Sequence, residues 1–393
     1  MQVVLIVIIL LTLHLKVLSF GGFDVALTWV LIPLFLLTSV NAPKFKIRRY
    51  HFFLLLLVVF LPFMSLKIKD WGEFFKTYMQ FAVSYFMVAY VLFKDVKINI
   101  KSFDKTLRMF QVISVVLVVY QYVVAVILGK LHLYNIFQDL QLYYPATAYA
   151  LEGRMKSVYL EPSYLGFVVV CIFWCRYNIN GSIKIGSNII LTIILLLFSK
   201  SAFGILGFIA FLVFEYFNKE VKFKYIKWIL GVIVGLLLFI FFSKDIIIAL
   251  RLNEFNVEPT DQLTSGYMRV ILPVITIYNL FMDGYYLGLP FGDLDYYVFN
   301  VFNEFGEASM SNSFFLIIAY WGLLGIAAYI LVLYIFVKNK KYRSFILLVF
   351  LSLNSSGAFV THQFAFVTFV LPIIVFKLNE SREIIIDCIS CHE

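Results

Sequence analysis

Charged side chains are scarce in this sequence of 393 residues. Only 14% of the residues are Asp, Glu, Lys or Arg, whereas 62% are hydrophobic. A soluble domain has about 25% charged and about 45–50% apolar residues, so this chain holds more apolar surface than one core could hide. That surplus excludes a soluble enzyme, a disordered chain and a secreted disulfide scaffold.

Cysteines and metal-ligand patterns are also few. The chain has four cysteines, and we find no group of side chains with the spacing of a metal site. We therefore expect no metal and no cofactor. Cys388, Cys391 and His392 do spell a haem-attachment pattern, but we expect this terminal tail to lie in the cytoplasm, on the wrong face of the membrane for haem attachment.

Long apolar runs are what the sequence has instead. A transmembrane helix needs about 20 apolar residues, and twelve stretches qualify. We expect a polytopic all-α integral membrane protein with about twelve transmembrane helices, forming a single transmembrane domain over 1–393. The stretches are roughly 2–20, 24–41, 51–66, 77–93, 109–128, 164–177, 187–199, 202–217, 228–243, 312–337, 344–359 and 362–378.

The stretch from 187 to 217 could be one long tilted helix or two helices separated at Ser199-Lys200-Ser201. A lysine in the middle of a lipid-facing helix costs about 2.5–3.5 kcal/mol. A turn at Lys200 avoids that cost, so the sequence favours two helices.

The basic residues orient the helices. The chain has 32 Lys and Arg against 23 Asp and Glu, a net charge of +9, and cytoplasmic loops of membrane proteins are rich in Lys and Arg. With the N-terminus in the cytoplasm, 21 of the 32 basic residues fall inside. We therefore expect a protein of the inner (cytoplasmic) membrane with both termini in the cytoplasm, and we attribute the positive charge to these loops rather than to nucleic-acid binding.

Two loops are long, 129–163 and 244–311, and both fall on the outer side. Long ordered loops frequently carry function. The residues that stand out in and beside these loops are, in chain order, Arg154, Glu161-Pro162-Ser163, Ser199-Lys200-Ser201, Arg269 with the stretch to Gly292, Ser311-Asn312-Ser313, and Gly322 with Gly325.

In this order the motifs resemble those of the O-antigen polymerase and O-antigen ligase superfamily of bacterial envelope glycan assembly. The family has an Arg shortly before a Glu/Asn-Pro pair, similar to Arg154 and Glu161-Pro162. Its Ser-Arg-Ser/Gly turn is similar to Ser199-Lys200-Ser201, with Lys in place of Arg. A Gly-x-Arg opens an amphipathic stretch, as at Arg269, and an Asn-Ser-Phe sequence opens a helix with Gly-x-x-Gly, as at Asn312.

One departure separates the branches of this family. Its ligases usually carry a His just before that Asn, where this chain has Ser311. The Glu-Pro-Ser sequence at 161–163 also looks more like the repeat-unit (Wzy-type) polymerases of capsule and O-antigen. We therefore favour a polymerase. A ligase that transfers glycan to lipid A-core, or a transporter of polysaccharide or lipid-linked sugar, is the alternative.

The resemblance implies a glycan on undecaprenyl diphosphate as the substrate, in contact with the lipid bilayer, and a chain-length regulator and a flippase as partners. It implies that Arg154, Lys200 and Arg269 bind the diphosphate, that Arg269 and Glu161 are catalytic, and that Ser311 and Asn312 lie on the acceptor side. Arginine suits phosphate because its planar group donates two hydrogen bonds at once.

Each of these residues also has an ordinary structural explanation. The arginines could pair with lipid phosphates or neighbouring acids, and Lys200 could extend its charge from a helix end to the interface. Glu161 could be a first-turn acid beside Pro162. Ser311 and Asn312 could cap the following helix.

Reporter fusions test the predicted topology. Fusions at residues 145 and 275 should report the outer side, and fusions at 222 and 385 the cytoplasm, because this arrangement places most of the Lys and Arg inside. Alkaline phosphatase and green fluorescent protein fusions would measure this. A fusion at 385 that reports the outer side would contradict the helix break at Lys200.

Overall fold

The computed structural model describes residues 2–20, 23–39, 68–93, 96–136, 148–180, 186–218, 271–301, 312–355 and 359–390, and these are mostly helical. They form two compact units: one comprises 1–199, 290–292 and 358–393, and the other comprises 200–289 and 293–357. The expected helical architecture is therefore confirmed. Each unit is described by itself below.

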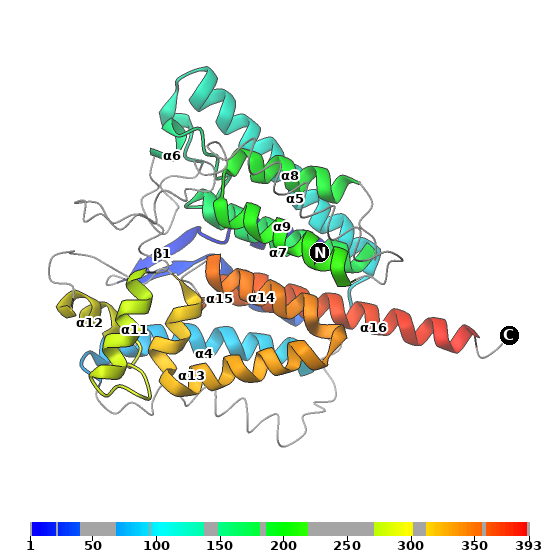
Figure 1. Ribbon diagram of the computed structural model, residues 1–393. Coiled ribbons are helices and arrows are strands. Elements are labelled where there is room, and N and C mark those ends of the chain that lie inside the picture. Colours follow the sequence, from blue (N-terminus) through cyan, green and yellow to red (C-terminus); the bar gives the residue numbers. More distant parts are fainter. Residues whose placement is uncertain are drawn as a thin grey trace. The chain divides into compact units, whose positions relative to one another are not determined.

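The first unit is built mainly around three neighbouring helices, α5, α7 and α8, which contact one another (Figure 1). Helix α1 packs on α5 and α2, while α4 and α16 belong to the same unit. Its elements are α1 (Gln2–Leu11), β1 (Lys16–Phe20), β2 (Phe23–Ala26), α2 (Thr28–Ser39), α4 (Trp71–Phe93), α5 (Ile100–Tyr122), α6 (Ala148–Leu151), α7 (Pro162–Asn180), α8 (Ser187–Ser199), α15 (His362–Ala365) and α16 (Leu371–Ser390). A π-helical turn, Val123–Ile127, continues α5, and another, Phe366–Val370, joins α15 to α16.

The second unit contains the long helix α13 (Ser313–Lys338), with α11 (Leu272–Met282) and α14 (Arg343–Ser355) packed against it. Helix α9 (Ala202–Asn218) packs on α14, and α12 (Asp293–Val301) completes the unit. Helices α11 and α12 lie within the long loop predicted over 244–311.

The N-terminal segment differs from the prediction. We expected one helix over 2–20, but α1 ends at Leu11 and is followed by an antiparallel hairpin in which Lys16 pairs with Ala26 and Phe20 with Phe23. Ten helical residues extend about 15 Å, half of the roughly 30 Å hydrocarbon core. The prediction of a helix over 2–20 is therefore wrong. Hydropathy does not distinguish a strand rich in aliphatic and aromatic residues from a helix.

Four helices in the described residues are long and apolar enough to cross a membrane. They are Ile100–Ile127, Pro162–Asn180, Ser313–Lys338 and His362–Ser381, and each overlaps a predicted span. The predicted spans 51–66 and 228–243 lie outside the described residues. The membrane character is supported, and the count of twelve stays a prediction.

The helix break at Lys200 is confirmed. Helix α8 ends at Ser199, α9 begins at Ala202, and Lys200 adopts a left-handed φ of 45°. The backbone N–H of Gly204 donates to the Ser201 hydroxyl, which caps α9. The exposed Lys200 side chain is thus at a turn, as the cost of burying a lysine in lipid predicts.

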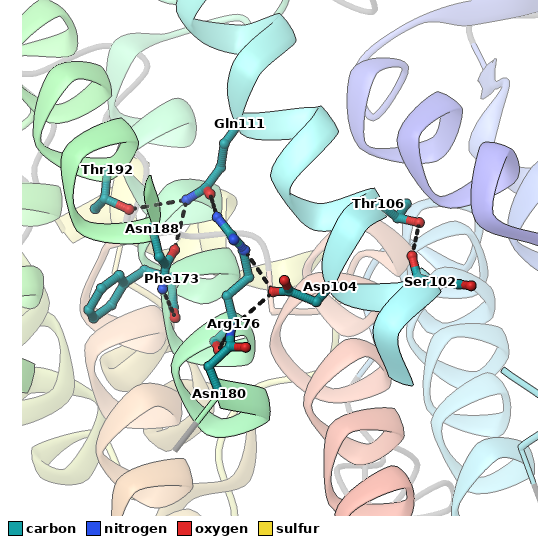
Figure 2. Close-up of polar contacts among 9 residues, drawn as sticks. All are labelled: Ser102, Asp104, Thr106, Gln111, Phe173, Arg176, Asn180, Asn188 and Thr192. Atoms are coloured by element: carbon teal, nitrogen blue, oxygen red, sulfur yellow. Dashed lines mark hydrogen bonds and ion pairs between the residues drawn. The ribbon is translucent and has the colours of Figure 1, made fainter. Parts of the chain in front are cut away.

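A buried polar network fixes one end of α5, α7 and α8 (Figure 2). The Arg176 guanidinium of α7 donates to Asp104 at 2.9 Å and to Gln111 at 2.6 Å, both on α5. Gln111 in turn donates to Asn188 and Thr192 on α8. Because Arg176 is only 4% exposed, this pairing satisfies a charge that would otherwise be costly to bury.

Glycines allow the turn from Tyr286 to Leu289 to insert into a break in α13. Gly322 has a non-helical φ of 54°, so the backbone of α13 is interrupted there. The N–H of Leu323 donates to Tyr286, and the N–H of Leu289 donates to Ala319. A Cβ on Gly322 would lie 2.0 Å from the Tyr286 oxygen, so this contact requires glycine.

The glycine pair Gly288 and Gly284 provides a matched test of this contact. Both have a positive φ, 84° and 83°, but a Cβ at Gly288 would lie 2.5 Å from the Tyr320 backbone, whereas the described residues leave the space at Gly284 open. Gly284→Ala should cost about 1–2 kcal/mol for the left-handed backbone, and Gly288→Ala should cost clearly more. Thermal unfolding in detergent would measure both. Equal shifts would show that the turn is not held against α13.

Candidate functional site

The loop from Glu152 to Glu161, which joins α6 to α7, is fixed by one side chain from α5. The Gln121 amide nitrogen donates to the carbonyls of Tyr134 and Ser157, both at 2.8 Å. Its oxygen accepts from the backbone N–H of Ser157 at 2.8 Å and of Lys156 at 3.2 Å. Gln121 is fully buried. One amide thus holds two otherwise distant backbone segments in a defined geometry.

Arg154 lies in this loop and forms one ion pair and one contact with an aromatic ring. Its Nη1 pairs with Glu152 at 3.1 Å, and its guanidinium carbon lies 5.2 Å from the centre of the Tyr149 ring. The Arg154 side chain is 12% exposed and Glu152 is 49% exposed. Because Glu152 is half exposed, solvent weakens this ion pair, so Glu152 is a partner that an anionic ligand could displace.

Lys156 is completely buried in the same loop. Its ammonium group lies 5.4 Å from the centre of the Tyr134 ring. Burial lowers the pKa of Lys156 to about 8, and the negative charge of Glu161 opposes that shift. At neutral pH the side chain therefore still carries its charge.

Glu161 is at the N-terminal end of α7. Its backbone carbonyl accepts from the N–H groups of Tyr164 and Leu165, and the Ser163 hydroxyl donates to its carboxylate at 2.8 Å. An acidic side chain is favourable at a helix N-terminus, so the ordinary structural explanation accounts for part of its placement. The side chain is partly exposed and can be reached by a ligand.

The loop is also linked to α8. The backbone N–H of Met155 donates to the carbonyl of Phe198 at 2.8 Å, two residues before Lys200 in the sequence. The structure thus brings Arg154 and Glu161 into one loop and attaches this loop to the helix that ends just before the Lys200 turn. Lys200 itself belongs to the second unit.

Of the remaining predicted site residues, one belongs to the second unit and two are not described. Arg269 and Ser311 lie outside the described residues. Asn312 is 1% exposed, and its side chain accepts from the N–H of Phe314 at 2.9 Å and donates to Asn354 at 3.2 Å. Asn312 therefore caps α13, and its acceptor-side role stays a prediction.

No group of three or more His, Cys, Asp or Glu side chains within the described residues could hold a metal ion. The two basic side chains of the loop, Arg154 and Lys156, are able to form hydrogen bonds and ion pairs with an anionic ligand.

Two residues of this site, Gln121 and Lys156, were not predicted from the sequence. Gln121 interrupts an otherwise apolar run, and polar residues in such runs usually have a specific partner, so that signal was present. Lys156 is two residues from Arg154 in the same loop, but nothing in the sequence distinguishes a buried lysine from a solvated one.

Gln121→Leu should loosen the loop without unfolding the helices around it. The change leaves two backbone N–H groups and two carbonyls without their partner, and each stranded group costs about 1–3 kcal/mol. We expect faster amide hydrogen exchange at 155–158, measured by mass spectrometry, with little change in α8. Gln80→Leu on α4, a partly exposed position, is the control. Unchanged exchange in Gln121→Leu would contradict the role of this side chain.

Comparison with known proteins identifies the family to which the chain belongs. No curated protein and no solved structure matches it. The family model described as WcaD colanic acid polymerase matches residues 1–378, nearly the whole chain. Members of a polymerase family of this kind join polysaccharide repeat units supplied as lipid-linked glycans, and the apolar helices fit a membrane protein. The chain is therefore a polysaccharide polymerase, and it belongs to the WcaD colanic acid polymerase family.

Proposed function

We propose that the chain joins oligosaccharide repeat units carried on undecaprenyl diphosphate at the outer face of the cytoplasmic membrane, building an O-antigen or capsule polysaccharide. The match to a polymerase family over residues 1–378 carries this proposal. A flippase that supplies the lipid-linked units and a chain-length regulator are its proposed partners.

The proposed chemistry requires fixed positive charge near the lipid. Breaking the bond between the sugar and the phosphate leaves additional negative charge on the diphosphate. Preorganised cations stabilise such charge most strongly where water is excluded. Arg154, Lys200 and Arg269 are the proposed cations, and Arg154 lies in a loop that Gln121 holds in place.

Glu161 is the proposed general base, which takes the proton from the attacking sugar hydroxyl. A base must be within hydrogen-bond reach of that hydroxyl and must be ionised. The Ser163 hydroxyl donates to one oxygen of this carboxylate, and Glu161 directly precedes the first residue of α7. Glu161 is partly exposed, which supports access by a sugar hydroxyl.

Substitutions at Arg269 and Lys200 test the role of positive charge. Arg269→Ala should abolish polymerisation and Arg269→Lys should retain a little, because lysine does not reproduce a bidentate contact. Lys200→Arg restores the residue usual in the resembling family and should be tolerated. Loss of one such contact costs about 2.7–4 kcal/mol in the transition state, roughly a hundredfold to a thousandfold in rate. The measurement is the ratio of long chains to single repeats on a gel.

Protein abundance in the same membranes is the control, since a misfolded variant gives the same gel. Normal chain length from well-expressed Arg269→Ala would refute the cationic site. Deletion of the gene should leave single-repeat product. Full-length glycan that is no longer attached to core would indicate a ligase instead, and trapped inner-leaflet intermediates would indicate a transporter.

A further inference from the structure

Three buried side-chain donors in four consecutive residues are without an acceptor in the described structure. They are Nε of Arg154, Nζ of Lys156 and the hydroxyl of Ser157. Lys156 and Ser157 are both fully buried. Buried polar groups in folded proteins nearly always have a partner, so three adjacent exceptions, two of them cationic, require an explanation.

The backbone that carries the three donors is held in place by hydrogen bonds. Gln121 binds the backbone of Lys156 and Ser157, and Ser157 adopts a left-handed φ of 55°, a strained conformation that persists only where the surroundings impose it. The Tyr134 hydroxyl donates to the Arg154 carbonyl at 2.6 Å, and the ring of the same tyrosine lies against the Lys156 ammonium. Tyr134 thus contacts the residues on both sides of Met155.

The nearby acids do not satisfy this positive charge. Glu152 pairs with Nη1 of Arg154, which leaves Nε free of a partner among the described residues. Lys156 and Glu161 interact through their charges but form no ion pair in the described structure. An ammonium group buried without an acceptor is costly. This unpaired charge lies in the same loop as Arg154 and Glu161, the proposed cation and the proposed base.

We propose that Arg154, Lys156 and Ser157 form a subsite for a phosphoryl oxyanion, and that the diphosphate of the lipid-linked donor occupies it. The inference rests on the proposed function for the identity of the donor. Arg154, the member with exposed surface, meets the ligand first. Lys156 reaches the same oxyanion by rotation of its flexible four-carbon stem, and the Ser157 hydroxyl supplies a third, uncharged donor.

Ligand binding by the purified protein tests this subsite without any need for polymerisation. The full chain is placed in phosphatidylcholine nanodiscs, and its unfolding midpoint is followed against undecaprenyl diphosphate and, separately, inorganic pyrophosphate, which gives a Kd. Lys156→Met should weaken binding of undecaprenyl diphosphate roughly tenfold to a hundredfold, the loss expected for a charge-assisted hydrogen bond. Ser157→Ala should weaken it roughly twofold to tenfold.

Two controls separate ligand binding from a structural role. Lys105→Met removes an exposed lysine of α5 and should bind as the wild type does. Without ligand, Lys156→Met should be at least as stable as the wild type, because it removes a buried charge that lacks an acceptor. A destabilised Lys156→Met that binds undecaprenyl diphosphate normally would overturn the subsite and leave Lys156 as a packing partner of Tyr134.

The source of the oxyanion is tested with a second membrane composition. Phosphatidylglycerol in the nanodiscs could raise the unfolding midpoint of the wild type but not that of Lys156→Met. If undecaprenyl diphosphate then raises the wild-type midpoint no further, the site holds a lipid headgroup and the donor assignment is overturned. Glu161→Gln should bind undecaprenyl diphosphate normally but make no polymer. A deletion strain that still makes full-length polymer would contradict the proposed function, whereas weakened binding by Lys156→Met would still support the subsite.

Discussion

The hydrogen bonds of Gln121 hold together the loop that carries the candidate site. A single amide satisfies four backbone groups, from Tyr134 and from Lys156 and Ser157, and without it the loop would have to bury these groups unpaired. Ten residues earlier on the same helix, Gln111 joins the Arg176 network that ties α5 to α7 and α8 (Figure 2). Two buried glutamines therefore make α5 the support for both the helix packing and the site.

The second unit also contains irregular backbone whose polar groups need partners, and there a glycine allows these contacts, whereas a glutamine makes them in the first unit. Where α13 is interrupted at Gly322, the N–H of Leu323 donates to the carbonyl of Tyr286, and the carbonyl of Ala319 accepts from the N–H of Leu289. The turn from Tyr286 to Leu289 thus supplies the partners that the broken helix lacks. Non-helical backbone in a membrane protein needs partners of this kind, because lipid supplies none. In both units irregular backbone is held by specific hydrogen bonds, and in the first unit the left-handed Ser157 lies in the same loop as three buried donors without an acceptor in the described structure. Such features are typical of sites where binding takes precedence over stability.

Several features followed from the sequence because they depend on local composition. The apolar runs predicted a helical membrane protein, and the cost of a lysine in lipid placed the helix break at Lys200, where the structure has it. The order of short motifs led to a polymerase, which the family match supports. Arg154 and Glu161 share one loop simply because they are seven residues apart. The hairpin formed by Lys16–Phe20 and Phe23–Ala26 was missed, since hydropathy does not distinguish a short apolar strand from a helix.

The sequence by itself determined the class of the protein, its family and the residue types available to the site, since apolar runs and short motifs are read locally. Only the tertiary structure decided which polar groups find partners. Gln121 meets residues 13 and 36 positions away, and these contacts decide that the Lys156 ammonium is buried rather than solvated. Burial and hydrogen bonding depend on segments that are distant along the chain, and no local pattern encodes the distance between them.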